Sequence, residues 1–218
     1  GVLAVQNGVS HGERVAAVLG REAVLPGATF VVAHREAPGV IRRTEPAQRI
    51  EFAPLAPEGR ARAERAAQAL RSAGVDARIV DDLPAVLWRK LALVDVTSTL
   101  GCLTRAPLGA WLSAPESRDL MRRAAQEVEA VAIALGLPLA GTADQVMATL
   151  ERLGPTLEPS MLADLRNGRP LEIDAIQGAI VRYGREQAVP TPVNEVAYAA
   201  LAPLHREALR RRAGAISG

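Results

Sequence analysis

Residues 83–94 read LPAVLWRKLALV, and this stretch divides the sequence into two differently patterned parts. Its apolar residues recur at the three- and four-residue spacing of a buried helix, which we expect to run from Leu83 to about Leu103. The same spacing carries Lys90 inward together with the apolar side chains. Lys90 is also the only lysine among 26 basic residues, so it is a candidate for a chemical role. The alternative is a chance lysine on a solvated face.

The sequence before Asp82 alternates between short apolar runs and helical patterns. The apolar runs lie at 2–5, 29–33, 39–42, 49–52 and 77–80, and the helical patterns at about 10–19 and 59–73. Strands that alternate with helices indicate a three-layer α/β arrangement. We therefore predict an α/β part over residues 1–82.

The sequence from Leu83 onward contains only helical patterns. Further helices are expected at 117–135, 142–153, 160–167, 173–187 and 192–210. Gly136, Gly154 and Gly168 follow three of these segments as helix stops. Residues 83–218 are therefore predicted to form an all-α part, and the fold class is α/β followed by all-α.

Composition argues against several classes of protein. The net charge is only +2, and arginines alternate with acids, which is typical of a solvated surface and not of a nucleic-acid site. The cluster 210–212 is expected to complement a helix C-terminus. No apolar run reaches membrane-spanning length, and a single cysteine, Cys102, forms no internal disulfide and fits the cytoplasm. His11, His34 and His205 lack ligand spacing, so no metal site is expected.

Two side chains suit chemistry on a bound ligand. A desolvated lysine releases its proton far more readily than an arginine does, which would suit Lys90 to proton donation. Asn7 follows the first predicted strand, at the kind of position where α/β sheets bind ligands. The alternative for Asn7-Gly8 is an ordinary turn. A strand followed by Gly-x-Gly-x-x-Gly does not occur in the 218 residues, so the run 2–5 is interpreted as a late strand of a larger sheet.

Four motifs occur together in the sequence. They are QNGV at 6–9, WRKLA at 88–92, SMLxDxRxGRPxEIDxIxG at 160–178 and VPTPVN at 189–194. In this order they closely resemble the ketopantoate reductases (2-dehydropantoate 2-reductases). The resemblance implies reduction of a 2-oxo acid to a 2-hydroxy acid with NADPH in pantothenate biosynthesis, by a cytoplasmic homodimer.

The same resemblance implies a domain organisation. Residues 1–82 would be the C-terminal portion of a Rossmann-type NADP-binding domain. Residues 83–218 would be a helical substrate-binding and dimerisation domain of the 6-phosphogluconate-dehydrogenase-like type. Compared with this family, the first third of the protein is expected to be missing, including the glycine-rich loop that binds the cofactor phosphates.

The resemblance also implies roles for individual residues. Lys90 matches the general acid, and Asn7 matches an asparagine that contacts both the nicotinamide nucleotide and the substrate. Ser160 matches a substrate-binding serine, and Glu172 matches a residue that contacts the cofactor near the lysine. Without the family, Ser160 would be interpreted as a helix N-cap and Glu172 as an acid in the first turn of a helix.

The sequence departs from the family at three positions that usually hold substrate-binding asparagines. These positions hold Val94, Ser98 and Leu108, of which Ser98 remains a substrate-binding candidate. Arg35 stands where the family usually has a small residue near the nicotinamide. Because two amides have become aliphatic, a bulkier or more apolar 2-oxo acid than ketopantoate is a plausible substrate.

Two other classes of function stay open at this point. One is a non-catalytic relative that serves interaction or dimerisation, which Val94, Leu108 and the missing glycine loop favour. The other is a different β-hydroxyacid-type dehydrogenase, such as a 6-phosphogluconate-type or opine-type enzyme. The single lysine at the catalytic position favours an enzyme.

Overall fold

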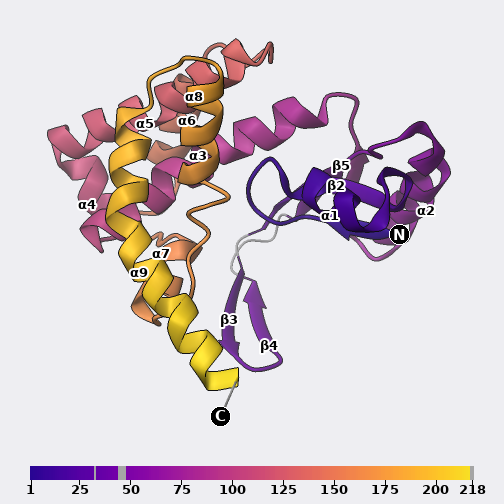
Figure 1. The fold of residues 1–218 in the computed structure, drawn as a ribbon, viewed down its shortest axis with the longest axis horizontal. Helices are drawn as coiled ribbons and strands as arrows, with labels where there is room; N and C mark the ends of the chain where they lie inside the picture. The colour runs from indigo at the N-terminus through magenta and orange to yellow at the C-terminus, as the bar shows by residue number, and fades with distance from the viewer. Residues whose placement is uncertain (32, 44–47, 217–218) are drawn as a thin grey trace. The chain divides into compact units, whose positions relative to one another are not determined.

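The structure, a computed structural model, describes residues 1–31, 33–43 and 48–216, which form two compact units. The first unit comprises residues 1–87 and the second comprises residues 88–218. The expected helix is present as α3 (Leu83–Thr104; Figure 1). The units divide within its second turn.

The first unit contains a four-stranded mixed sheet. Its strands are β1 (Val2–Ala4), β2 (Val24–Phe30), β5 (Arg49–Phe52) and β6 (Asp76–Ile79), in the order β1-β2-β5-β6. The β1–β2 and β5–β6 pairs are parallel, whereas β2 and β5 are antiparallel. Parallel pairs connected through helices are what the alternating sequence pattern predicts.

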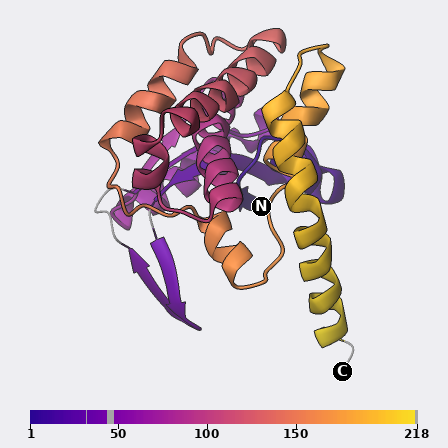
Figure 2. The same ribbon diagram turned by 90° about the vertical axis from the view of Figure 1, so that its left-hand side faces the viewer.

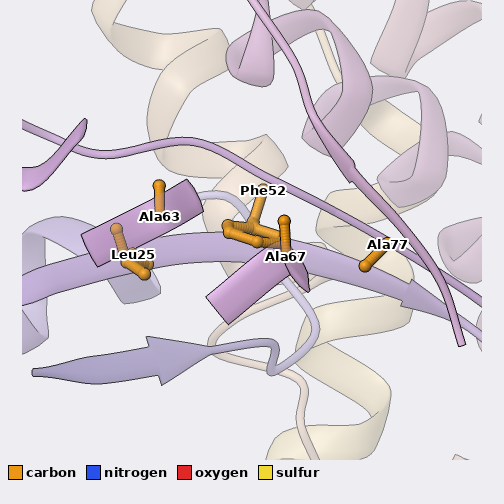
Figure 3. Close-up of a cluster of buried hydrophobic side chains, with 5 residues drawn as sticks. All are labelled: Leu25, Phe52, Ala63, Ala67 and Ala77. Carbon is orange, nitrogen blue, oxygen red and sulfur yellow. The ribbon is translucent and has the colours of Figure 1, made fainter. Parts of the chain in front are cut away.

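Helices cover both faces of this sheet, so the three-layer prediction is confirmed. On one face, α2 (Arg60–Ser72) packs Ala63 and Ala67 against Leu25 and Phe52 (Figure 3). On the other face, the first turns of α3 pack against the strands, and α1 lies against β2. The contacts of α3 are those of Leu83 and Leu87 with Ala28 of β2. The remaining helical segments of this unit are α1 (His11–Leu19), η1 (Arg21–Ala23) and η2 (Pro57–Gly59).

The strand β2 begins earlier than the sequence predicted. A strand at 29–33 was expected, but β2 starts at Val24 and ends at Phe30, and Val32 lies outside the described residues. Pro26 and Gly27 resemble strand breakers in the sequence, which hid this strand. Pro26 lies where β2 changes partner from β1 to β5. A Cβ on Gly27 would approach the backbone oxygen of Glu51 to 2.6 Å, so this close strand contact requires glycine.

A two-stranded hairpin extends from the first unit (Figure 1). It pairs β3 (Ala33–Ala37) with β4 (Val40–Arg43) in antiparallel fashion. Gly39 turns the chain with a φ of +78°, a conformation that glycine adopts without strain. The expected strand at 39–42 is therefore β4, whereas β3 was not predicted.

The second unit contains helices and connecting turns, with no strand among its described residues. α9 contacts α5 and α8, and its C-terminal part projects past the other helices of the unit (Figure 2). No helix among the described residues is both long and apolar enough to cross a bilayer. The helices that follow α3 are α4 (Leu108–Ser113), α5 (Pro115–Ala134), α6 (Thr142–Arg152), α7 (Ser160–Arg166), α8 (Gln177–Glu186) and α9 (Pro192–Ile216).

Most helices of this unit match the predicted ranges, with two differences. The short helix α4 was not predicted. The expected helix at 173–187 begins only at Gln177, because residues 173–176 form turns. Two carboxylates of α5 hold other helix starts: Glu129 accepts the backbone N–H of Ala143 at 2.6 Å, and Glu127 accepts that of Val193 at 2.7 Å. Such acceptors satisfy backbone donors that a helix start leaves unpaired.

Candidate functional site

Lys90 lies on α3 with its side chain half-buried. Burial lowers the pKa of its ammonium group below the ordinary value, and the charge of Glu172 acts in the opposite direction and raises it. A lysine in this setting can donate a proton more readily than a solvated lysine. The solvated-face alternative is therefore wrong.

Glu172 lies in a bend that precedes α8, five residues before the helix begins at Gln177. The interpretation as an acid of the first helical turn is therefore wrong. Its backbone carbonyl accepts the N–H groups of Ala175 at 3.0 Å and Ile176 at 3.1 Å, which fold the segment into turns. The structure thus brings Glu172 into electrostatic contact with Lys90 from a non-helical segment.

An aromatic pair fixes α3 beside Lys90. Trp88 is buried, and its ring meets that of Tyr183 on α8 edge to face, with centroids 5.5 Å apart. Such pairs contribute about 0.5–1.5 kcal/mol beyond the burial of their area. The guanidinium of Arg182 lies 4.9 Å from the Tyr183 ring centroid. Because Trp88 is only two residues before Lys90, this contact restrains the rotation of α3 about its axis.

The three positions that hold asparagine in the family differ in exposure. Val94 is half-buried one turn after Lys90, and the hydroxyl of Ser98 donates to the Val94 carbonyl of its own helix. Leu108 begins α4 and is 0% exposed. Leu108 is therefore packed in the core, where an amide in its place would also be buried.

Ser160 is the first residue of α7 and is exposed. Pro159 occupies the N-cap position, and its extended backbone leads into the helix. The interpretation of Ser160 as an N-cap is therefore wrong. Its hydroxyl is accessible to a ligand, and its role in substrate binding stays a prediction.

Asn7 belongs to the first unit, in the loop between β1 and α1. Gly8 follows with a φ of +95°, which turns the chain immediately after Asn7. His11 holds this loop from α1: its Nδ1 lies 3.2 Å from the Gly8 carbonyl oxygen and its Nε2 lies 3.1 Å from the Ala4 carbonyl oxygen. His11 therefore connects both ends of the loop. In the sequence, His11 was considered only as a metal ligand, so this role was not predicted.

A fully buried polar cluster lies further along α3. Asp95 is 0% exposed, and burial raises the pKa of its carboxyl group to about 8. Thr99 donates to Asp95 at 3.3 Å, and Gln177 of α8 donates to Thr99 at 3.0 Å. Asn194 of α9 is also fully buried and donates to Glu127 at 2.9 Å. In the sequence, this cluster is indicated by a single acid within the mostly apolar run LALVDVTSTLGCL. The cluster was not predicted.

The remaining sequence expectations concern metals and Arg35. Within residues 1–31, 33–43 and 48–216, no group of three or more His, Cys, Asp or Glu side chains could hold a metal ion. Arg35 lies in β3, and its side chain is outside the described part of the chain.

An α/β unit followed by a helical unit is the architecture of a Rossmann-type protein with a helical second domain. The helical unit carries the half-buried lysine and the carboxylate of Glu172. The family model "Ketopantoate reductase PanE/ApbA C terminal" matches residues 82–205, and the model "Ketopantoate reductase PanE/ApbA" matches residues 1–57. The chain therefore belongs to the ketopantoate reductase family.

Individual relatives agree with this assignment. The 2-dehydropantoate 2-reductase of Mycobacterium tuberculosis (strain H37Rv) is 34% identical over 200 residues, which cover 89% of this chain and 64% of the relative. The crystal structure of the Geobacter metallireducens 2-dehydropantoate 2-reductase is 32% identical with a TM-score of 0.84, covering 94% of this chain and 67% of that one. A D-mandelate dehydrogenase, solved with NADH and anilino(oxo)acetate, shares the fold at 23% identity and a TM-score of 0.85, covering 95% and 67%. The chain thus spans about two thirds of the length of these proteins.

Proposed function

We propose that this protein reduces a 2-oxo acid to a 2-hydroxy acid with NADPH, in the manner of a 2-dehydropantoate 2-reductase of pantothenate biosynthesis. The observation that carries the proposal is the only lysine of the chain, half-buried on α3 and coupled to Glu172. Family membership supplies the reaction class, and several relatives are named 2-dehydropantoate 2-reductase.

Lys90 is the proposed general acid. A bound nicotinamide cofactor would supply the hydride for the keto carbon. The ammonium group of Lys90 would then supply the proton that converts the keto oxygen into a hydroxyl group. Before transfer, the cationic form stabilises the negative charge that develops on this oxygen. Burial makes the proton easier to release, and Glu172 limits this effect so that the protonated form persists.

The residues present fit the nicotinamide end of a dinucleotide better than its phosphates. Asn7 follows the carboxyl end of a parallel strand, and the turn at Gly8 leaves its amide beyond the sheet. We assign Asn7 to contact the nicotinamide nucleotide and the substrate, and Glu172 to contact the cofactor. Asn7 lies in one unit and Glu172 in the other, so their joint contribution to the cofactor site stays a proposal.

Substrate binding is assigned to Ser160, Ser98 and Asn7. Ser160 offers an exposed hydroxyl, whereas that of Ser98 already donates to Val94 and would have to reorient toward a ligand. Val94 presents an aliphatic surface one turn from Lys90. We therefore propose a 2-oxo acid with a bulkier or more apolar side chain than ketopantoate.

A steady-state assay tests the proposal. The full-length protein is supplied with NADPH or NADH and a panel of 2-oxo acids that includes ketopantoate, branched-chain and aromatic members. We expect oxidation of NADPH with at least one acid. The control variant Arg89→Gln, which removes an exposed neighbouring cation, should retain the rate. Failure of every acid with both cofactors would instead support the non-catalytic alternative.

The oligomeric state and the compartment are also proposals. A homodimer is supported by a member of the family, the ketopantoate reductase of Staphylococcus aureus, which is dimeric. Sedimentation should then give twice the chain mass. Burial raises the pKa of the Cys102 thiol to about 12, so this cysteine is poorly suited to disulfide chemistry. A single inert thiol supports a cytoplasmic location, which fractionation of cells would test.

A further inference from the structure

Two side chains of α9 hold the segment that carries Glu172. The backbone N–H of Leu171 donates to His205 Nδ1 at 3.0 Å, and the Tyr198 hydroxyl donates to Asp174 Oδ1 at 2.7 Å. His205 Nε2 lies 3.7 Å from Asp174 Oδ2. The segment 171–174 is therefore attached to α9 on both sides of Glu172.

Helix geometry explains why these two side chains act together. Tyr198 and His205 are seven residues apart, which places them about two turns apart on the same face of α9. The attached segment alternates between buried and more exposed residues. Leu171 is 5% exposed and Ile173 is 1% exposed, whereas Glu172 is half-buried and Asp174 is exposed. The apolar residues anchor the segment in the core, and the α9 contacts fix its position along the helix.

The state of His205 follows from its hydrogen bond. The Leu171 N–H can donate to Nδ1 only when that nitrogen carries no proton, so we assign the ring proton to Nε2, which faces Asp174. Asp174 in turn accepts from Tyr198, and this hydrogen bond raises the pKa of the phenol. His205 and Tyr198 therefore each direct a proton toward the carboxylate of Asp174.

Close packing adds a further restraint where the segment joins α8. A Cβ on Gly178 would lie 2.9 Å from Tyr198 Cε2 and 3.1 Å from the Ile173 carbonyl oxygen. Tyr198 therefore packs its ring against the start of α8 at Gly178, while its hydroxyl group holds Asp174 of the segment. Glu172 has little freedom to move its backbone independently of α9.

We propose that His205 and Tyr198 are positioning residues, which hold Glu172 beside Lys90 through the segment 171–174. Neither residue need touch substrate or cofactor. The catalytic consequence rests on the proposed function, whereas the structural consequence does not. If the attachment loosens, Glu172 moves and its influence on the Lys90 ammonium group weakens.

The single lysine permits a direct test. With lysine labelled with ¹³C at Cε, the 218-residue chain gives one side-chain NMR signal, whose titration reports the pKa of Lys90. Glu172→Gln provides the reference: it removes the charge that raises this pKa, so the value should fall. We expect His205→Leu, which removes the acceptor for Leu171, to lower the pKa in the same direction by a smaller amount.

Matched variants separate positioning from general loss of structure. In His205→Asn, an oxygen stands at the same number of bonds from the backbone as Nδ1, so it should largely restore the Lys90 pKa. Tyr198→Phe removes only a hydroxyl group and should lower the pKa slightly. Thr149→Val removes a side-chain hydrogen bond within α6 and should leave the pKa unchanged.

The double variant His205→Leu/Glu172→Gln decides the mechanism. If His205 acts through Glu172, the double variant should titrate like Glu172→Gln alone. An additive shift, or an unchanged pKa in His205→Leu, overturns the proposal. If His205→Leu does not fold, an unchanged pKa in Tyr198→Phe overturns it.

A kinetic measurement keeps this proposal distinct from the proposed function. In an active enzyme, His205→Leu should displace the alkaline limb of the kcat profile to lower pH and alter KM less than kcat. If the wild-type protein reduces no 2-oxo acid, the proposed function fails. The NMR titration still decides the positioning role in that case.

Discussion

Lys90 and Asp95 lie five residues apart on α3, and burial shifts both toward their neutral forms in opposite directions on the pH scale. The pKa of Lys90 is lowered and that of Asp95 is raised. The surroundings differ. Lys90 is half-buried with one acid nearby, whereas Asp95 is 0% exposed among hydrogen-bonding side chains of α8 and α9. Desolvation therefore favours a neutral structural acid at Asp95 and an easily released proton at Lys90.

Asp95 is suited to structure and not to chemistry on a ligand. Three buried oxygens in its cluster, Asp95 Oδ2, Gln177 Oε1 and Asn194 Oδ1, receive no hydrogen bond from the part of the chain that the structure describes. An ionised carboxylate would leave all three as acceptors, whereas a protonated carboxyl group becomes a donor. The shift of the Asp95 pKa to about 8 agrees with a neutral acid in the core at pH 7. Lys90, in contrast, retains partial access to solvent and hence to a substrate.

The largest expected effect is on the catalytic rate and concerns Lys90. We expect Lys90→Arg to lower kcat for 2-oxo acid reduction by roughly 10²–10⁴-fold, because a guanidinium group does not release its proton as a general acid must. The measurement is NADPH oxidation at saturating substrate, with the fold checked by circular dichroism. A rate within a few-fold of wild type would contradict the assignment of Lys90 as proton donor.

The next effect is on the pH dependence of stability and concerns Asp95. The folded-state pKa of about 8 lies above the unfolded value near 3.8, so the folded chain binds a proton that the unfolded chain has released. The free energy of unfolding should then fall as pH rises between these values, by at most about 1.4 kcal/mol per pH unit. Over pH 5 to 8 the loss could reach about 4 kcal/mol, and above pH 8 it should level off. Asp95→Asn should lack this loss.

Urea unfolding at several pH values measures this effect. Trp88 and Trp111 both belong to the second unit, so their fluorescence follows the unit that contains Asp95. Asp119→Asn, at an exposed acid of α5, is the matched control and should retain the wild-type dependence. Equal pH dependence in wild type and Asp95→Asn would show that Asp95 is ionised in the native protein.

The sequence predicted elements whose formation depends on local pattern. α3 was predicted because its apolar spacing is continuous over more than five turns. β2 was misplaced because Pro26 and Gly27 usually interrupt strands, and only its change of partner makes them acceptable there. The residues 173–176 were predicted as helix because the apolar Ile173 and Ile176, three residues apart, continue the helical spacing of α8. Their contacts with α9 instead stabilise turns.

The candidate site shows the same difference between features set by local pattern and features set by contacts between distant residues. Lys90 was found from composition, and Glu172 from its motif, and their roles remain predictions. Asp95 and His205 were missed because their partners are distant in sequence. Gln177 lies 78 residues after Thr99, and His205 lies 34 residues after Leu171. No local pattern indicates which buried acid or lone histidine will meet such partners.

A third effect extends the comparison to Leu108. This side chain is apolar but resembles Asp95 in its complete burial. We expect Leu108→Asn to reduce the free energy of unfolding by about 3 kcal/mol, because an amide is buried and apolar packing is lost. Urea unfolding at one pH measures it. A loss below about 1 kcal/mol would indicate that the position opens to solvent or to a ligand pocket.

The smallest effect tests whether the Lys90 end of α3 sets substrate choice. Val94 is half-buried one helical turn from Lys90, so an asparagine there can reach solvent or a ligand without the burial cost expected at Leu108. Val94→Asn should raise kcat/KM for ketopantoate relative to larger apolar 2-oxo acids by about fivefold, since one added hydrogen bond contributes about 1 kcal/mol. Competition between two acids in one NADPH assay measures this ratio directly. An unchanged ratio in a folded variant would mean that the aliphatic surface at Val94 does not contact the substrate, and that specificity resides at Ser160, Ser98 or Asn7 instead.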